Sequence, residues 1–379
     1  MTAIQFIRPT QGRLLLSLLL LGSILPAFAC LASLSAGQFR GIQFIGIQDF
    51  SAFEKSVTND PSETVIVSPE IRSEIAWNEL IPSWNLSAAA PAMKIEVRAI
   101  YDHGTTPYYV LGLWSTRTNL YPRKSVSHQK DQWGSVKTDT LVLQKHCDRL
   151  QVRLTFPESI AAKDLKFFSL CLSDSRYVAS ALAPSRFAWG RLIPVPERSQ
   201  MAWPQGEELC SPTALSMMLA FYAQKLDRPE LDRPVPEIQA AIYDETWKGT
   251  GNWPFNTAYA GSFPNMRACV TRFSDVSEIE EWVACGLPVA LSVCYNKLRG
   301  KEGEPSGHLV VCVGFSKSGD PIINDPGTSR NVRKRFKRKN LISAWAHSRN
   351  TVYLVYPVNA KLPVDRFGHW SYSHSLSGE

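Results

Sequence analysis

The sequence predicts an α+β protein in which an all-β sandwich domain, residues 40–180, precedes a domain of mixed helices and strands, residues 207–357. The chain has 379 residues, which is more than one compact core usually holds. The first stretch consists of short alternating segments, whereas helix-like and strand-like segments follow one another in the second. Residues 181–206 are rich in proline and lack periodicity, which predicts a linker and the entry to the second domain. We expect a C-terminal tail over residues 358–379.

The chain begins with the layout of a secretory signal peptide. Arg8 and Arg13 precede the apolar run LLLSLLLLGSILPAFA, which ends in the small residues Ala27 and Ala29. We therefore expect residues 1–29 to be removed and the protein to be exported, either to the periplasm or out of the cell. The run is short for a membrane span and no second stretch of spanning length follows, so no transmembrane span is expected after removal of the signal.

The residue after this run allows a second interpretation. Cys30 directly follows Ala29, so lipid anchoring of the bacterial lipoprotein type is the alternative. Ala27 stands where such signals usually have leucine and Phe28 is bulky, which favours cleavage without a lipid. Loss of the two arginines of the signal lowers the net charge from +7 to +5. This mild basic excess gives no indication of a nucleic-acid partner.

Strand-like alternation dominates the first domain. Polar and apolar residues alternate over Lys94–Ile100, as in a strand with one buried face. Trp84 and Trp114 lie beside small polar residues; core packing is the favoured interpretation, and stacking on a cell-wall or surface glycan is the alternative. The three histidines of this domain, His103, His128 and His146, are too scattered to have the spacing of metal ligands. We therefore expect neither a metal nor another cofactor.

The chain contains eight cysteines, and an exported protein can pair some of them. Cys147 and Cys171 both fall in strand-like stretches of the first domain. A disulfide between them and two buried free thiols are equally consistent with the sequence. The pairing of the later cysteines cannot be read from their spacing.

One cysteine stands at the start of a predicted helix. In the stretch EELCSPTALSMMLAFY, Cys210 is followed by Ser211 and Pro212, which fit a helix cap and a first turn. Apolar residues then recur along one helix face. A helix N-terminus favours thiolate over thiol, and the thiolate is the nucleophilic form. Cys210 is therefore a candidate nucleophile, and a buried inert cysteine is the alternative.

Two later strands supply the partners that such a nucleophile needs. His308 begins the strand-like stretch GHLVVCVGF and Asp325 ends the next one, which follows the turn SKSGD. In a hairpin, both residues would lie at the same end of the sheet. A histidine can take the thiol proton and later give it to the leaving amine, and an aspartate can orient the ring. We therefore predict a catalytic triad of Cys210, His308 and Asp325, with Asn324 as the alternative orienting residue.

These stretches carry a resemblance to a known family. Residues 190–357 resemble the bacteriocin-processing (double-glycine leader) peptidase-like family of papain-fold cysteine peptidases, through VPERSQ, CSPTALSMMLAFY, GHLVVCVGF and INDP. The resemblance implies a papain-like fold and cysteine-peptidase chemistry. It also implies an oxyanion-hole glutamine shortly before the cysteine; Gln200 matches it, with Gln205 as the alternative. Members fused to export ATPases trim leader peptides, but this chain has no P-loop, so that substrate is not implied.

An aromatic stretch lies between the nucleophile and the base. The sequence GNWPFNTAYAGSF, residues 251–263, places three aromatic side chains among small residues and predicts a loop. Trp253, Phe255 and Tyr259 are candidate substrate-binding residues of a cleft. A loop packed onto the core is an equal alternative.

The sequence thus predicts an exported cysteine peptidase that cleaves a peptide or protein substrate through an acyl-enzyme intermediate. One alternative is a non-catalytic cell-surface or wall binding protein whose peptidase-like domain only holds a peptide. The other is a papain-fold amidase or transpeptidase, which would use the same triad with a different substrate or acceptor.

Overall fold

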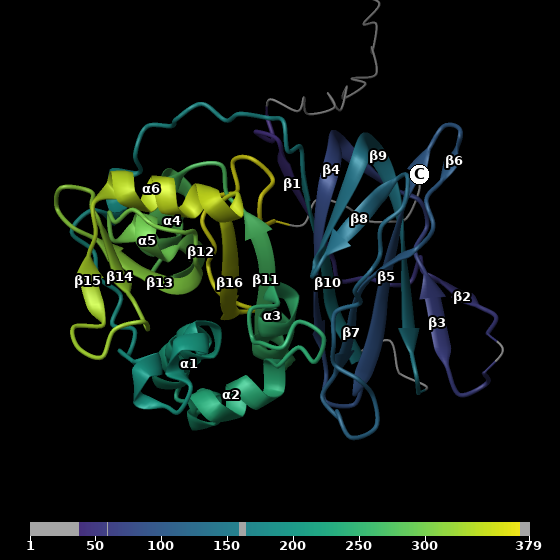
Figure 1. Ribbon diagram of the computed structural model, residues 1–379, viewed down its shortest axis with the longest axis horizontal. Coiled ribbons are helices and arrows are strands. Elements are labelled where there is room, and N and C mark those ends of the chain that lie inside the picture. The colour runs from purple at the N-terminus through teal and green to yellow at the C-terminus, as the bar shows by residue number, and fades with distance from the viewer. Residues whose placement is uncertain (1–37, 59, 159–163, 372–379) are drawn as a thin grey trace, which may run out of the picture. The chain divides into compact units, whose positions relative to one another are not determined.

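Figure 1 shows the computed structural model of the chain, which describes residues 38–58, 60–158 and 164–371. All of these residues belong to one compact unit. Two separate sheets form within it, one from the first half of the chain and one from the second. The chain therefore has the predicted order, a strand-rich N-terminal domain followed by a domain with helices.

The N-terminal domain is a ten-stranded antiparallel sheet. β4 and β9, of 16 and 17 residues, pair with different partners along their lengths and so join all the strands into one network. The two sheets expected of a sandwich are thus connected through these long strands. The elements are β1 (Ile42–Ile47), β2 (Glu54–Ser56), β3 (Thr64–Val67), β4 (Ile71–Leu86), β5 (Ala92–Tyr101), β6 (Gly104–Thr105), β7 (Tyr109–Ser115), β8 (Gly134–Lys137), β9 (Thr140–Phe156) and β10 (Leu165–Ser173).

The predicted alternation holds in β5. Ile95 and Val97 are fully buried in the core, whereas Lys94 on the opposite face forms an ion pair with Glu96. Trp84 and Trp114 are buried and pack edge to face with ring centroids 6.2 Å apart. These two rings belong to the core, so they cannot stack on a sugar, and the feature that suggested a glycan site is absent.

The C-terminal domain is a six-stranded antiparallel sheet in the order β11-β16-β12-β13-β14-β15. Its strands are β11 (Met266–Arg272), β12 (Val289–Cys294), β13 (Gly307–Phe315), β14 (Pro321–Asn324), β15 (Arg333–Arg335) and β16 (Thr351–Pro357). Its helices are α1 (Cys210–Leu226), α2 (Val235–Ile242), α3 (Trp253–Ser262), α4 (Val276–Ala284), α5 (Tyr295–Leu298) and α6 (Arg338–Trp345). Helix α1 packs against β13, the central strand that carries His308.

Two segments expected to lie outside the folded domains are part of them. In the predicted linker, the N–H of Ile193 donates to the carbonyl of Val313 at 2.7 Å, which adds this segment to the end of β13. In the predicted tail, His369 and Trp370 are buried. Prolines and low periodicity mark an irregular backbone, but an irregular backbone can still be packed and hydrogen-bonded.

The N-terminal domain contacts the C-terminal domain through the edge strand β11. The side chain of Asn85 on β4 accepts from the N–H of Ala268 at 3.1 Å and donates to its carbonyl at 2.8 Å. The hydroxyl of Ser83 accepts from the N–H of Val270 at 2.8 Å. A Cβ on Gly261 of α3 would lie 2.0 Å from the Asn85 amide, so only glycine permits this approach. Side chains of β4 thus satisfy an otherwise open sheet edge.

Candidate active site

Cys210 is the first residue of helix α1. The N-cap is Leu209, whose side chain makes no capping hydrogen bond, and Ser211 and Pro212 lie inside the first turn. The helix therefore starts earlier than the expected Ser211 cap. Because no side chain caps this end, its N–H groups and positive dipole are directed at the cysteine. This arrangement favours the thiolate form of Cys210.

The β13–β14 hairpin brings His308 and Asp325 together. Its register pairs Val311 with Asn324, which places Asp325 opposite Val310, on the face that His308 also occupies. His308 Nε2 lies 2.8 Å from Asp325 Oδ1, and both side chains are buried. Cys210 and His308 line the same pocket, and each shifts the pKa of the other. The structure thus brings together the three residues of the predicted triad.

Asn324, the alternative orienting residue, points to a different part of the domain. Its Nδ2 donates to the carbonyls of Val195 and Pro196 at 3.2 and 3.3 Å, and its Oδ1 accepts from Arg333 at 3.0 Å. Since neighbouring residues of a strand alternate between faces, only one of the pair 324 and 325 can reach His308. Asp325 is that residue.

Tyr295 supports the histidine and the aspartate together. Its ring lies against the His308 imidazole with centroids 4.1 Å apart, and its hydroxyl donates to Asp325 Oδ2 at 3.1 Å. The backbone N–H of Gly327 donates to Asp325 Oδ1 at 2.9 Å. A Cβ on Gly327 would lie 2.8 Å from the Tyr295 hydroxyl and 3.0 Å from His308, so this turn needs glycine. Asp325 is therefore held by three separate donors.

The charges of the triad favour an ion pair. Burial opposes ionisation of the Cys210 thiol, but the hydrogen bond to His308 and the charge of that residue outweigh it and lower the pKa of Cys210. Burial also disfavours the imidazolium, but the bonds to Asp325 and Cys210 raise the pKa of His308 to about 9. Burial of Asp325 is likewise outweighed by His308, so the pKa of Asp325 is lowered. All three directions favour the ion pair of thiolate and imidazolium, with Asp325 as a carboxylate.

A pocket of about 340 Å³ opens onto the triad. Cys210 and His308 line it together with Trp247, Trp253 and Tyr353. Of the three aromatic residues expected to bind substrate, only Trp253 reaches this pocket.

Phe255 and Tyr259 are placed elsewhere, because the expected loop is helix α3. Phe255 is fully buried, with its ring centroid 6.2 Å from that of Trp84, so it cannot contact a substrate. Tyr259 packs edge to face on Phe263 and its hydroxyl lies 3.3 Å from Glu237, outside the pocket. The assignment of Phe255 to substrate binding is therefore wrong, and Tyr259 has no contact that supports it.

Gln200 lies close to the triad but not in the pocket wall. It is buried, its N–H donates to the carbonyl of Pro326 at 3.0 Å, and its Nε2 donates to the carbonyl of Gly206 at 2.7 Å. That bond orients the amide and leaves the second N–H of Nε2 without a partner among the described residues. Gln205 is exposed, with its backbone in the left-handed region at φ 56°. Of the two glutamines, only Gln200 is in a buried and oriented position.

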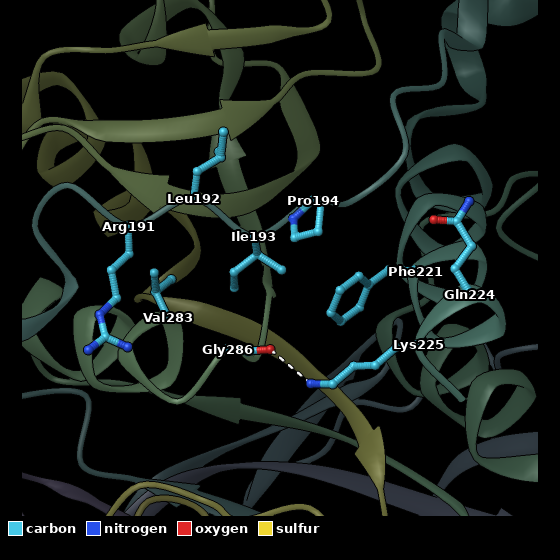
Figure 2. Close-up of a pocket in the computed structure, with 9 residues that line it drawn as sticks. All are labelled: Arg191, Leu192, Ile193, Pro194, Phe221, Gln224, Lys225, Val283 and Gly286. Atoms are coloured by element: carbon cyan, nitrogen blue, oxygen red, sulfur yellow. Dashed lines mark hydrogen bonds between the residues drawn. The ribbon is translucent and has the colours of Figure 1, made fainter. Parts of the chain in front are cut away.

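A larger pocket than the one at Cys210 lies apart from the triad. It has a volume of about 710 Å³ and is lined by Ile193, Pro194, Phe221 and Lys225, among others, with Lys225 Nζ 3.5 Å from the carbonyl of Gly286 (Figure 2). It shares no residue with the pocket at Cys210, and no cysteine, histidine or carboxylate lines it. The chemistry of the lining therefore assigns the active site to the smaller pocket.

Sequence reasoning missed one residue that supports the triad and two that line the pocket. Tyr295 directly follows β12, the strand that pairs with β13, and this adjacency was the only signal in the sequence. Trp247, which is 49% exposed, lies in a turn-rich stretch before Trp253. Tyr353 reaches the pocket from β16, far along the chain. Such residues become neighbours only through the order of strands in the sheet.

Other features of the described residues limit the chemistry. The cysteines at 147, 171, 210, 269, 285, 294 and 312 are free thiols, so Cys147 and Cys171 are not bridged. No group of three or more histidine, cysteine or carboxylate side chains suited to a metal occurs in the described part of the chain. None of the helices described here is long and apolar enough to cross a membrane. The signal segment and Cys30 lie outside the described residues.

Comparisons with known proteins identify the family that each half of the chain matches. Residues 192–353 match the Peptidase C39-like family, and residues 46–163 match the Peptidase C39 N-terminal domain. No curated protein matches the chain. Among solved structures, a protein described as a C39-like peptidase from Bacillus anthracis is 18% identical, with 45% of this chain and 98% of that chain covered and a TM-score of 0.33. The VPA0106 protein from Vibrio parahaemolyticus is 11% identical, with 85% and 89% covered and a TM-score of 0.16.

These TM-scores are too low to bear on the fold, so the family matches carry the assignment. The first match contains Cys210, His308 and Asp325, and the second covers most of the strands of the domain before it. The resemblance read from the sequence is confirmed: residues 192–353 match the Peptidase C39-like family, and the domain before them matches the N-terminal domain of C39 peptidases.

Proposed function

We propose that the protein is a cysteine peptidase that hydrolyses peptide bonds with Cys210 as nucleophile, His308 as general acid and base, and Asp325 as the residue that orients His308. The observation that carries this proposal is the chain of contacts from Cys210 to His308 to Asp325, at the uncapped start of helix α1. A non-catalytic binding domain has no need for a buried, charged triad whose ionised state is stabilised.

The first half of the reaction forms an acyl-enzyme. The Cys210 thiolate attacks the scissile carbonyl carbon, a C–S bond forms, and the carbonyl oxygen becomes an oxyanion. The N–H of Cys210 and the second Nε2–H of Gln200 are the donors proposed for this oxyanion. When the C–N bond breaks, the imidazolium of His308 gives its proton to the leaving amine. The products of this half are a free amine and a thioester on Cys210.

The second half releases the acid. A water molecule attacks the thioester while neutral His308 accepts its proton, and the C–S bond breaks to leave a carboxylic acid and the Cys210 thiolate. The imidazolium is thereby restored. Throughout, Asp325 holds His308 through Nε2, so that Nδ1 is the ring nitrogen available to the sulfur and the substrate.

The test compares the reactivity of two thiols in the same protein. Cys285 is exposed and lies away from the triad, and burial raises its pKa, so it serves as an internal reference. Iodoacetamide at pH 6, followed by peptide mapping, should label Cys210 and leave Cys285 unmodified. The wild-type protein should also cleave a proteome-derived peptide library that the Cys210→Ser variant leaves intact, with little change in thermal stability. A Cys210 that reacts only after unfolding would contradict the proposal.

We also propose that the protein is exported, on the basis of Arg8, Arg13 and the apolar run that ends at Ala29. N-terminal sequencing of exported protein should find a start at or near Cys30. An intact Met1 on exported material would overturn this.

A further inference from the structure

A second pocket continues from the catalytic pocket toward the N-terminal domain. It has a volume of about 380 Å³, and it shares the walls formed by Trp247, Trp253, His347 and Ser348 with the pocket at Cys210. Its other walls include residues 137–140, which form the turn between β8 and β9 of the N-terminal domain. The two pockets therefore form one cleft, to which both domains contribute.

Hydrogen bonds connect the β8–β9 turn to the wall of the cleft. The carboxylate of Asp139 is buried and accepts a hydrogen bond from the backbone N–H of Trp253 at 2.8 Å. It also accepts from the hydroxyl of Thr140 at 3.1 Å. Trp253 is both the first residue of α3 and a wall shared by the two pockets. Asp139 of the N-terminal domain thus fixes the backbone of Trp253, the residue that lines both pockets.

The charges that face solvent in this second pocket are positive. Its two carboxylates are buried and engaged: Asp139 by Trp253, and Glu79 by Arg272 at 2.6 Å and Arg349 at 3.3 Å. The Arg349 side chain is 49% exposed. Lys137 is exposed and has no ion-pair partner among the described residues. A chain that enters the pocket therefore meets the exposed Lys137 and Arg349, whereas Asp139 is buried and Glu79 is ion-paired.

We propose that the N-terminal domain completes the substrate cleft and that Lys137, with Arg349, binds a carboxylate of the peptide substrate at a fixed distance from the scissile bond. This inference rests on the proposed function, because the bound peptide is the one that reaches Cys210. The carboxylate is either an acidic side chain or the C-terminal carboxylate of the peptide; both offer the same partner to an ammonium and a guanidinium.

The experiment measures how fast peptide probes label Cys210. Epoxysuccinyl peptides, extended on either side of the electrophile, carry Asp, Asn or Lys at one position at a time. A parallel set ends in a free carboxylate or in an amide at each length, which separates an acidic side chain from a chain terminus. Labelling of the full chain is followed by mass spectrometry. At one position, the acidic probe should react about five- to tenfold faster than its neutral counterpart, and high salt should reduce the difference.

Charge reversal supplies the control. Lys137→Glu should invert the order, so that the Lys probe becomes the fastest at that same position. Lys145→Glu makes the same change in net charge at an exposed site of β9 outside the cleft, and it should leave the order unchanged. Equal rates for all probes in the wild type, or equal effects of the two variants, would overturn the inference and leave the proposed function intact. If neither iodoacetamide nor any of the probes labelled Cys210, both the inference and the proposed function would be wrong.

Discussion

His308 Nε2 lies 2.8 Å from Asp325 Oδ1, across the antiparallel pair β13 and β14. This contact determines the roles of the two ring nitrogens. With Nε2 occupied by the carboxylate, Nδ1 is left for the sulfur of Cys210, and the carboxylate stabilises the imidazolium that the thiolate needs as its partner. The tautomer and the orientation of the base thus follow from the register of one hairpin.

The first prediction concerns the acidity of Cys210. In the wild type, alkylation of Cys210 by iodoacetamide should proceed at lower pH than alkylation of Cys285, because His308 lowers the pKa of Cys210. In His308→Ala, the largest of the effects that oppose the burial of Cys210 is lost, so the pKa of Cys210 should rise toward the ordinary value of about 8.5. The rate of labelling at each cysteine, measured from pH 5 to 10, checks this. A profile for Cys210 that is the same in both proteins would contradict the ion pair.

The second prediction separates Asp325 from its neighbour. Asp325→Asn should lower kcat/KM on the order of tenfold or more, because an amide cannot stabilise the imidazolium by charge. In the wild type, activity should fall above a pH of about 9, where His308 loses its proton. Loss of the Asp325 charge lowers the pKa of His308, so this alkaline limb should move to lower pH in the variant.

Asn324→Ala is the matched control for that variant. It removes the partner of Arg333 and of two backbone carbonyls, so it should lower the free energy of unfolding by about 2 kcal/mol. The alkaline limb of the pH profile should stay in place. If Asn324→Ala moved the limb and Asp325→Asn did not, the orienting residue would be misassigned.

The third prediction concerns the oxyanion. Gln200→Ala should lower kcat by about 10²- to 10³-fold with a smaller change in KM, because the donor acts on charge that develops only in the transition state. Gln205→Ala, at an exposed position, should leave kcat unchanged. Steady-state kinetics on a peptide cleaved by the wild type make the comparison. Equal kcat values for Gln200→Ala and the wild type would exclude Gln200 as the donor.

The fourth prediction concerns Asp139, the carboxylate that joins the domains. Burial raises the pKa of Asp139 from 3.8 to about 6. Between these two pH values the folded protein holds a proton that the unfolded chain has lost, so stability falls as pH rises through this window. Asp139→Asn cannot titrate and keeps an oxygen for the N–H of Trp253. Relative to the wild type, its free energy of unfolding should therefore rise by up to about 3 kcal/mol between pH 4 and pH 7.

Urea unfolding of both proteins at several pH values in that window checks the slope. The other titrating groups are common to the two proteins and cancel in the difference. If the difference in free energy of unfolding between the two proteins did not change with pH, the pKa of Asp139 would not be raised by folding.

The proximity of Cys210, His308 and Asp325 was predictable because each residue lies where a local pattern changes. Cys210 precedes a helical period, His308 opens an apolar strand, and Asp325 follows a short strand after a glycine turn. The choice between Asp325 and Asn324 was not predictable, since it depends on the face that each residue occupies. A hairpin register that contains an irregularity between Cys312 and Gly314 cannot be counted from the sequence.

The prediction of a substrate-binding loop over residues 251–263 was wrong for a different reason. The small residues of 251–263 predict a loop, but Asn252 and Pro254 are the N-cap and the first turn of helix α3. Phe255 then turns into the core, where it meets Trp84 and Trp114 of the other domain. Contacts between residues so far apart in the chain leave no periodic signal. The domain interface, and with it the second half of the cleft, is therefore visible only in three dimensions.

The packed C-terminal segment has a practical consequence for the size of the smallest autonomous piece. His369 is bonded on one side to Glu278 of α4 at 2.6 Å and on the other to the carbonyl of Phe39 at 2.8 Å, while Trp370 fills a gap beside Trp282. A fragment that ends near residue 357, at the last strand of the C-terminal domain, would lack His369 and Trp370. Trp282, against which Trp370 packs, would then be exposed to solvent. Shortened versions made for crystallisation or engineering should therefore keep Phe39 near one end and both His369 and Trp370 near the other.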